Sequence, residues 1–371
     1  MNNKVVQLST VHYINDVRIF SKEAISLSQN GFEVHMIGLV YEGIELNTNL
    51  RNIFYHPLKS IANSRIINSV INIPISMFKI LKIKPAVIHF HDPELIFTGL
   101  FFHFLGYKVI YDVHEDLPED VFYKVIPEIF KRPISVLMSF IEKYSSSIFK
   151  NVITVTPIIQ ARFEQYTDNS IKIANYPPAS NYPLKEYSKD NFNLCYVGSI
   201  DESRGIFQML DIINSFNGKI YLNLCGKFSS KDLFEKSKKH PAWKWVIFHG
   251  LIPHEKVFKI ISDSFLGLLI LSNRKTFEDS YPIKLFEYMS MEIPVLASDF
   301  KYWRNQFEVH DCIYFCDPKN QIKLNESVQN AINNKEISMK MGVNGRSAYL
   351  KNYTWDVEAK KLVSFYNKIL K

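Results

Sequence analysis

Residues 276–298, TFEDSYPIKLFEYMSMEIPVLAS, combine a predicted helix start with charged side chains. Pro282 is typical of the first turn of a helix, and we expect a helix to open there after an apolar strand. The unpaired N–H groups and the partial positive charge of a helix N-terminus suit a diphosphate. Lys284 adds a point charge in that turn. Glu287, one turn later, is placed to accept hydrogen bonds from ribose hydroxyls. A surface helix with routine charges is the alternative interpretation.

Two further segments carry histidines and carboxylates just past the ends of predicted strands, IHFHDPE at 88–94 and YDVHEDLPE at 111–119. We interpret them as polar strand ends that line a ligand site, where neutral or protonated imidazole bonds a sugar hydroxyl or a phosphate. A metal centre is not expected, because neither HExxH nor facial-triad spacing is present. Loop histidines that cap local turns are the alternative. The residues selected are His91, Asp92, His114 and Glu115.

Three weaker patterns lie elsewhere in the chain. In VGSIDESRG, Arg204 precedes a helix, where its guanidinium could clamp a phosphate or lie in a solvated turn. In LCGKF, Gly226 permits close approach of a ligand and Lys227 follows it. In STVHYINDVRIF, a polar loop follows the first strand, and one of its residues, Asp16, also suits a helix N-cap. The loop residues selected are His12, Asn15, Asp16 and Arg18.

Strands and helices that alternate along the chain must position these segments. Strands are predicted at 4–8, 33–39, 86–90, 108–113 and 152–155, and at 192–197, 220–225, 245–248, 266–271 and 294–297. A helix is predicted to follow Asp16, with Val17, Phe20, Ala24 and Leu27 on one face. Further helices are predicted to begin at Pro93 and near Gly205, Ser230, His254, Pro282, Gln321 and Ser338, and two more are predicted over 133–149 and 355–370. This alternation implies parallel βαβ units. The predicted fold class is α/β, with two doubly wound, Rossmann-like parallel-sheet domains that face a central cleft.

Residues 175–190, NYPPASNYPLKEYSKD, contain three prolines and few aliphatic residues, which is typical of an interdomain linker. The predicted domains are 1–180 and 190–353, followed by an amphipathic helix in 354–371. A hydrophobic content of 47% and a charged content of 22% fit two globular domains and exclude a disordered chain.

The net charge of +7 is scattered rather than gathered in a basic stripe, so nucleic acid is not an expected partner. Anionic small ligands and an anionic membrane surface both fit. The four cysteines form no CxxC pair, which favours reduced thiols and a cytoplasmic protein. The N-terminus MNNKVVQLST lacks the apolar core of a signal peptide. No GxGxxG follows a predicted strand, which argues against a dinucleotide-dependent dehydrogenase.

Taken together, five segments resemble family 4 retaining glycosyltransferases of the GT-B fold, and most closely the bacterial enzymes of surface-polysaccharide assembly. The segments are HYINDVRIFSKEAISLSQNGFEV, IHFHDPELI, VIYDVHEDLPE, VGSIDESRGI and YPIKLFEYMSMEIPVLASD. The last is the most specific, and the similarity covers essentially the whole chain. The resemblance implies that residues 1–180 form an acceptor-side domain and 190–353 a nucleotide-sugar domain, and that the final helix crosses back to the first domain.

The resemblance also assigns roles by position. It places His114 on the donor sugar and phosphate, Arg204 on the diphosphate and Glu287 on the ribose. Either Glu278 or Asp279 is expected to bond the donor sugar. The expected catalytic residues are His114, Arg204 and Asp279; the donor-binding residues are Lys227, Leu251, Ile252, Glu278, Tyr281, Pro282, Ile283, Lys284 and Glu287; and the acceptor-side residues are His12, Asn15, Asp16, Arg18, His91, Asp92 and Glu115.

The chain departs from the family in two places. No glycine precedes Gly31, so the family's glycine-rich loop after the first strand is missing, and Lys227 replaces the second glycine of its Gly-x-Gly. The expected reaction is transfer with retention from a nucleotide-diphosphate sugar, with UDP preferred over GDP as the nucleotide, by a front-face route. Fixed cations would stabilise the leaving phosphate, so neither a metal nor another cofactor is required. The alternatives are a nucleotide-sugar-binding scaffold without turnover and a GT-B nucleotide-sugar epimerase.

The acceptor is expected to be a glycan or a polyprenyl-linked sugar. Residues 59–84 and 129–150 mix large apolar side chains with lysine and arginine. Basic amphipathic helices can lie on an anionic membrane, which would put the enzyme at the inner membrane face. Ordinary packing of helices within the first domain is the alternative.

Overall fold

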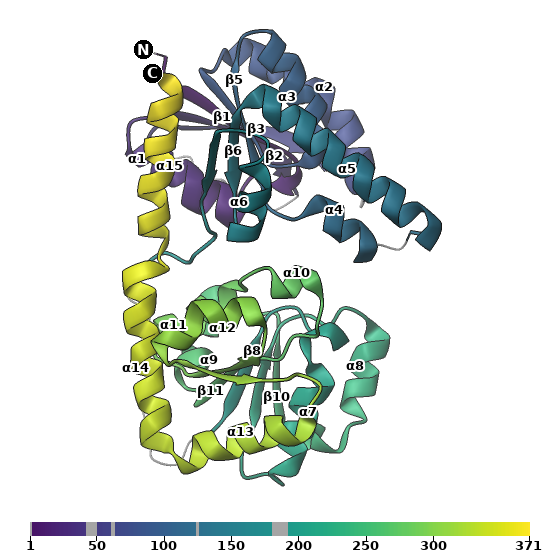
Figure 1. Cartoon of the computed structure of the whole chain (residues 1–371), viewed down its shortest axis with the longest axis vertical. Coiled ribbons are helices and arrows are strands. Elements are labelled where there is room, and N and C mark those ends of the chain that lie inside the picture. Colours follow the sequence, from purple (N-terminus) through teal and green to yellow (C-terminus); the bar gives the residue numbers. More distant parts are fainter. Residues whose placement is uncertain (1, 42–49, 61–63, 124–125, 180–191) are drawn as a thin grey trace. The chain divides into compact units, whose positions relative to one another are not determined.

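The computed structural model describes residues 2–41, 50–60, 64–123, 126–179 and 192–371. The chain divides into two compact units, Met1–Asn175 with Trp355–Lys371, and Tyr176–Thr354. Each unit has its own parallel sheet with helices on both faces (Figure 1). The predicted pair of doubly wound α/β domains is therefore confirmed. Most of the predicted linker lies outside the described residues.

The first unit contains a sheet of seven parallel strands in the order β3-β2-β1-β4-β5-β6-β7. The strands are β1 (Lys4–Tyr13), β2 (Glu33–Val40), β3 (Ile53–Lys59), β4 (Val87–Phe90), β5 (Lys108–Val113), β6 (Asn151–Thr154) and β7 (Asn169–Lys172). The helices are η1 (Val17–Ala24), α1 (Ile25–Gln29), α2 (Arg65–Ile83), η2 (Pro93–Leu95), α3 (Ile96–Phe104), α4 (Leu117–Asp120), η3 (Val121–Tyr123), α5 (Glu128–Phe149), α6 (Pro157–Phe163) and α15 (Trp355–Leu370). Sequence patterns missed the two edge strands, β3 and β7.

Alternate residues of each central strand pack on opposite faces of this sheet. Val5 and its neighbours on β2, β4 and β5 join a core with Leu362 of α15, whereas Val6 joins a second core with Phe102 of α3 and Phe149 of α5. The C-terminal helix α15 is thus part of the first unit. Its packing against the sheet brings Tyr366 close to the polar ends of β1 and β4.

The segment after β1 departs from the predicted helix face at Val17, whereas Phe20, Ala24 and Leu27 do pack in the core. Residues Val17–Ala24 form a π-helix, whose wider turn changes which side chains face the core. Val17, predicted to face the core, is exposed, whereas Arg18, Lys22 and Glu23 are buried. Asp16 is the N-cap as predicted, and its carboxylate accepts hydrogen bonds from the backbone N–H groups of Arg18 and Ile19.

The second unit contains a sheet of six parallel strands in the order β10-β9-β8-β11-β12-β13. The strands are β8 (Leu194–Val197), β9 (Leu222–Cys225), β10 (Val246–Gly250), β11 (Leu266–Leu269), β12 (Val295–Ser298) and β13 (Ile313–Cys316). The helices are η4 (Glu202–Arg204), α7 (Ile206–Ser215), α8 (Lys231–Lys238), η5 (Pro241–Trp245), α9 (His254–Ser262), α10 (Lys275–Glu278), α11 (Ile283–Ser290), α12 (Lys301–Phe307), η6 (Glu308–His310), α13 (Gln321–Asn333) and α14 (Lys335–Asn352). Strand β13 and helix α10 were not predicted.

The strand order reverses direction once in each sheet, between β1 and β4 and between β8 and β11. In doubly wound sheets, ligands bind beyond the carboxyl ends of the strands at such a reversal, because the flanking loops diverge there. Two of the selected segments follow β1 and β4 in the first unit and two follow β8 and β11 in the second, whereas the segments with His114 and Lys227 follow the adjacent strands β5 and β9. Each unit therefore places its candidate residues where its topology favours a ligand.

Candidate active site

In the second unit, Lys284 lies across the end of strand β8. It belongs to the first turn of α11, whose N-cap is Pro282, so the predicted helix start is confirmed. A β-carbon built on Gly198 would lie 2.2 Å from Lys284 Cε, and the Lys284 ammonium lies over the Tyr196 ring, 5.6 Å from its centre. Burial, together with the positive charge of Arg204, lowers the pKa of Lys284 to about 8. Within the described part of the chain, no carboxylate forms an ion pair with this ammonium.

Arg204 ends the short helix η4 beside the same strand end. Its Nε lies 3.0 Å from Asp201 Oδ2, and Asp201 also accepts a hydrogen bond from the Arg204 backbone N–H. The next residue, Gly205, has φ +77°, and a β-carbon there would lie 2.3 Å from the carbonyl oxygen of Ile270. Only glycine fits between η4 and the end of β11. Arg204 and Lys284 thus form a pair of cations at the strand reversal of this sheet.

The acidic residues of this unit flank α11. Glu287 lies one turn after Lys284 and is 8% exposed. Glu278 and Asp279 are half-buried at the end of the short helix α10, which precedes Pro282. Tyr281 stacks on Tyr302 with ring centres 4.8 Å apart. The loop between the two helices is held by Trp303, whose indole N–H donates to the Ser280 carbonyl at 2.7 Å.

The remaining donor residues lie at the ends of β9 and β10. Lys227 is exposed directly after Gly226, whose φ is +141° and whose β-carbon position is 1.7 Å from the Gly198 carbonyl oxygen. Leu251 is 75% exposed and follows Gly250, and Ile252 is half-buried. The Gly226 N–H donates to the Gly250 carbonyl, which ties the two loops together. The structure therefore groups the selected residues of this unit along the carboxyl edge of one sheet.

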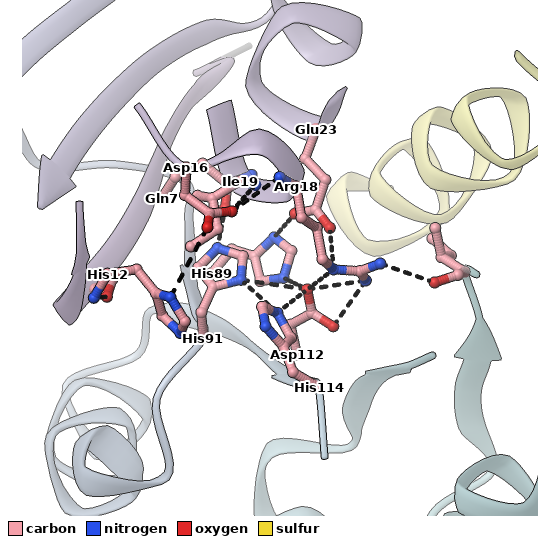
Figure 2. A network of polar contacts seen from close by, with 12 residues as sticks. Gln7, His12, Asp16, Arg18, Ile19, Glu23, His89, His91, Asp112 and His114 are labelled. Carbon is pink, nitrogen blue, oxygen red and sulfur yellow. Dashed lines mark hydrogen bonds and ion pairs between the residues drawn. The ribbon is translucent and has the colours of Figure 1, made fainter. Parts of the chain in front are cut away.

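In the first unit, the Asp112 carboxylate is at the centre of a buried polar network (Figure 2). Its Oδ2 lies 2.9 Å from His114 Nε2 and 3.2 Å from His91 Nδ1. The Arg18 guanidinium donates to both oxygens of Asp112. Burial alone would raise the pKa of Asp112, but the Arg18 charge and the histidine contacts hold it well below its usual value. Asp112 is therefore ionised.

The network continues through β1 and β4 to the C-terminal helix. His91 Nε2 lies 2.7 Å from Gln7 Oε1, and the Gln7 amide N–H donates to the Tyr366 hydroxyl at 3.3 Å. The Tyr366 hydroxyl also lies 2.7 Å from His89 Nδ1. Gln7 and His89 are neighbours in the β1–β4 register. A chain of polar contacts thus runs from helix α15 to Asp112.

Arg18 and Asp92, two of the residues assigned to the acceptor side, are buried. Arg18, predicted to lie in a polar loop, is 5% exposed and contacts Asp112 and Glu23. Asp92 is fully buried and accepts hydrogen bonds from the Ser9 hydroxyl and the Thr10 N–H. Both predictions of an accessible side chain are wrong, because in each case the partners come from distant parts of the chain. These residues fix the shape of the strand ends.

The other first-unit candidates differ in accessibility. His91 is 2% exposed and buried within the network, although it was predicted at a ligand-lining strand end. His114 and His12 have side chains that are 20% and 37% exposed, with ring centres 5.9 Å apart. Asn15 and Glu115 are exposed. His12 and His114 are therefore the imidazoles of this site that a ligand can reach.

Four buried side chains of the network have the composition of a metal site. One ligand atom from each of Glu23, His89, His91 and Asp112 lies within 4.8 Å of the others. However, the Arg18 Nε is 3.0 Å from Glu23 Oε1, and the same guanidinium donates to Asp112. Arg18 thus already supplies a cation to both carboxylates. Burial and the adjacent Asp112 raise the pKa of Glu23 well above its usual value.

Sequence reasoning missed Asp112 and His89, although a signal was present. Side chains two residues apart on a strand share a face. Asp112 therefore shares a face with His114, and His89 with His91, which brings four polar groups together. Gln7 and Tyr366 carried no comparable signal, because glutamine on a strand and tyrosine on an amphipathic helix are common without any role in a site.

The comparisons with known proteins agree with this arrangement. Residues 184–348, which lie within the second unit, match the family described as glycosyl transferases group 1. The chain is a glycosyltransferase with a group 1 domain. No curated protein matches the amino-acid sequence of this chain.

Solved structures of glycosyltransferases share the fold of this glycosyltransferase. Sucrose-phosphate synthase from Thermosynechococcus elongatus superposes with a TM-score of 0.78 at 15% identity, over 99% of each chain. HepE from Anabaena, solved with UDP-glucose, gives 0.72 at 12% identity, over 98% of this chain and 99% of its own. WaaG, a glycosyltransferase involved in lipopolysaccharide biosynthesis, gives 0.70 at 12% identity over 98% and 99%. At these identities the likeness shows the GT-B fold, and the expected fold is confirmed.

Proposed function

We propose that this glycosyltransferase moves a sugar from a UDP-sugar, with retention at the anomeric carbon, to a glycan or lipid-linked acceptor in bacterial surface-polysaccharide synthesis. The observation that carries the donor assignment is the position of Lys284. It is a half-buried cation that packs against Gly198 and lies near Arg204, at the strand reversal of the group 1 domain. A diphosphate supplies the negative charge that two adjacent cations at this position require.

The residues of the second unit support the following roles. Arg204 and Lys284 stabilise the negative charge that develops on the β-phosphate as its bond to the sugar breaks. Glu287 accepts hydrogen bonds from the ribose, and the backbone of Leu251 and Ile252 holds the base. Glu278 or Asp279 bonds the donor sugar. Lys227, Tyr281, Pro282 and Ile283 complete the proposed donor site.

In the proposed front-face reaction, the bond between the anomeric carbon and the phosphate oxygen breaks, and the acceptor oxygen bonds to the same face of that carbon. The acceptor proton passes to the leaving phosphate oxygen, so no carboxylate nucleophile is required. His114 bonds the donor sugar in this proposal. The fixed cations take the place of a divalent metal, and we expect activity in the presence of EDTA.

Calorimetric titration with UDP, GDP and a panel of their sugars, with Mg²⁺ or EDTA, tests the donor site. We expect one nucleotide and one of its sugars to bind without metal, and the Lys284→Met variant to lose most of that affinity. Absence of binding to every nucleotide would overturn the assignment. Release of UDP in the presence of an acceptor extract distinguishes transfer from a scaffold, which binds without turnover. Conversion of the free UDP-sugar to an isomer would indicate an epimerase.

The outer faces of α2, α3 and α5 support a membrane-associated acceptor. These helices cover one face of the first sheet through Ile80, Phe102 and Phe149. Their outward sides expose Ile66, Val70 and Phe78 on α2, Phe97, Phe101 and Phe104 on α3, and Ile129, Val136 and Phe140 on α5. Among the described helices, α2 is long and apolar enough to cross a membrane by length and composition. Its inner side packs in the core, which favours a helix lying on the surface.

Basic residues border these apolar faces. Lys82 and Lys84 are exposed at the end of α2, and Arg132 and Lys143 on α5. We propose that α2, α3 and α5 contact an anionic bilayer on its cytoplasmic side, where a polyprenyl-linked acceptor is presented. Vesicles that contain phosphatidylglycerol should co-sediment with the protein, and vesicles of phosphatidylcholine should not. A Val70→Ser, Phe78→Ser, Phe140→Ser variant should lose this binding and keep UDP affinity. Equal sedimentation of variant and wild type would exclude this surface.

A further inference from the structure

The contact between Asp112 and His114 determines where the hydrogens of this imidazole lie. An ionised carboxylate accepts hydrogen bonds and donates none. Asp112 is fully buried and ionised, and His114 Nε2 lies 2.9 Å from its Oδ2. His114 Nε2 must therefore carry a hydrogen. In neutral His114, Nδ1 is then the unprotonated nitrogen, free to accept a hydrogen bond.

Asp112 is itself held from several directions. Arg18 donates to both carboxylate oxygens, and its remaining Nη1 donates to the Ile173 carbonyl at 3.1 Å. His91 contacts the same oxygen of Asp112 as His114 does, at 3.2 Å. These groups are buried, whereas His114 has a side chain that is 20% exposed. The fixed part of the network thus ends at His114, a partly exposed imidazole (Figure 2).

We propose that Asp112 is a positioning residue, which holds His114 in the tautomer protonated at Nε2 and leaves Nδ1 to accept a hydrogen bond from a hydroxyl of the donor sugar. This inference rests on the proposed role of His114 at the donor. It selects a sugar hydroxyl over a phosphate as the partner of neutral His114, because an unprotonated nitrogen cannot donate to a phosphate oxygen.

The C-terminal helix contributes to the same orientation. Tyr366 contacts Gln7 and His89, and Gln7 contacts His91, which shares Oδ2 of Asp112 with His114. A change at Tyr366 therefore reaches His114 through Gln7 or His89, and from there through His91 and Asp112. Removal of the Tyr366 hydroxyl should have the same kind of effect as a change at Asp112, but a smaller one.

Asp112→Asn is the decisive variant, because it keeps the shape of the side chain and replaces one acceptor by a donor. The Arg18 guanidinium only donates, so it pairs with the amide oxygen of the new side chain, and the amide NH₂ group then faces His91 and His114. Because this NH₂ group donates, His114 Nε2 must accept, and the hydrogen of neutral His114 moves to Nδ1. We expect kcat to fall by about 10- to 100-fold, as for a misplaced catalytic contact. The KM for the donor should change by less than about threefold, since most donor contacts lie in the group 1 domain. Tyr366→Phe should lower kcat by a few-fold.

Long-range ¹⁵N–¹H NMR of histidine-labelled wild-type protein reads the tautomer directly, with His114→Ala to assign the signal. We expect hydrogen on Nε2 in the wild type and on Nδ1 in Asp112→Asn. Hydrogen on Nδ1 in the wild type would overturn the inference even if no variant folds. Asp112→Asn should also have no further effect on kcat in the His114→Ala background, and additive losses would show a role independent of His114. Failure of UDP-sugar binding in the wild type would instead remove the proposed function, whatever the tautomer.

Discussion

The Lys284 side chain passes so close to Gly198 that a β-carbon at residue 198 would lie 2.2 Å from Lys284 Cε and 2.6 Å from Nζ. Gly198 also has φ +127°, a conformation that other residues rarely adopt. This glycine therefore determines where the ammonium group lies. Its effect on ligand binding can be separated from its effect on the backbone.

Gly198→Ala should push Lys284 out of its position and weaken binding of UDP by about tenfold or more, the loss of one charge-assisted contact. Gly31→Ala is the matched control, because Gly31 has φ +89° but nothing within 4 Å of its β-carbon position. Both variants should lose about 1–2 kcal/mol of stability from backbone strain. Isothermal titration with UDP should show the affinity loss in Gly198→Ala alone. If Gly198→Ala and the wild type bind UDP with equal affinity, Lys284 does not contact the ligand.

The lowered pKa of Lys284 predicts that donor binding takes up protons at alkaline pH. In the protein without ligand, Lys284 has a pKa of about 8. Burial and the charge of Arg204 lower this pKa, and Glu287 and Asp201 oppose the change. A bound diphosphate favours the charged form, so affinity for UDP-glucose should fall as pH rises above 8. Calorimetry in buffers of different ionisation enthalpy should detect uptake at pH 8.5 and none at pH 6.5. Lys284→Met should abolish the uptake, and persistence in that variant would assign it to another group.

The sheet strands of both units could be predicted because their apolar runs are bounded by polar turns. Two of the three strands that were missed, those of the first unit, are atypical: β3 contains Pro57, and β7 is the polar NSIK. Both lie at an edge of the sheet, where a strand needs less apolar surface because only one side is paired. Local sequence carries little evidence of such strands. Their presence follows from pairing with β2 and β6.

The candidate donor residues could be found because several of them lie within one contiguous segment with a helix start. The histidine network was found only in part, since its charges are balanced by residues far apart in the chain. Arg18 and Asp112 are 94 residues apart, and neither identifies the other. The predicted helix face is correct for Phe20, Ala24 and Leu27, but in the π-helix Val17 is exposed and Arg18 is buried. Polar residues that looked like a surface loop are therefore part of a buried network.

Arg204→Ala should lower turnover more than ground-state binding of the donor. A cation that acts on the developing phosphate charge contributes mainly in the transition state, and its loss should reduce kcat by about 10²–10³-fold. Arg204→Lys is the matched control, because lysine keeps the positive charge but lacks the planar guanidinium group that contacts Asp201. Steady-state kinetics with UDP release as the readout would measure both constants. Equal losses in kcat and in donor affinity would make Arg204 a binding residue only.

Glu287→Ala should weaken UDP binding while the protein stays folded. A carboxylate that accepts hydrogen bonds from ribose contributes about 1.5–3 kcal/mol, which corresponds to roughly 10- to 100-fold in affinity. Titration of wild type and variant with UDP and with its 2′-deoxy analogue would localise the contact. The wild type should discriminate between the two nucleotides, and the variant should discriminate less. Retention of both affinity and discrimination in Glu287→Ala would remove the ribose role.

The buried His91 predicts that the first unit loses stability in mild acid. Burial lowers the pKa of His91 to about 4, whereas in the unfolded chain it is near 6.5. Between these values the unfolded state binds more protons, so the free energy of unfolding falls as pH drops from 6.5 to 4. At pH 4, protonation of His91 in the unfolded chain has lowered the free energy of unfolding by about 3 kcal/mol. Burial of His56 and His89 shifts their pKa in the same direction, which adds to the slope.

His91→Gln isolates this contribution, because glutamine can still donate to Asp112 but does not titrate. Urea unfolding at pH 7, 5.5 and 4.5, followed by hydrogen exchange of the β4 and β5 amides, reports the stability of the first unit. The wild type should lose stability steeply across this range, and His91→Gln should show a shallower dependence with a lower stability at pH 7. The same steep slope in both proteins would assign the acid sensitivity to His56 and His89. It would also mean that His91 is already protonated in the folded protein, as a donor to both Asp112 and Gln7.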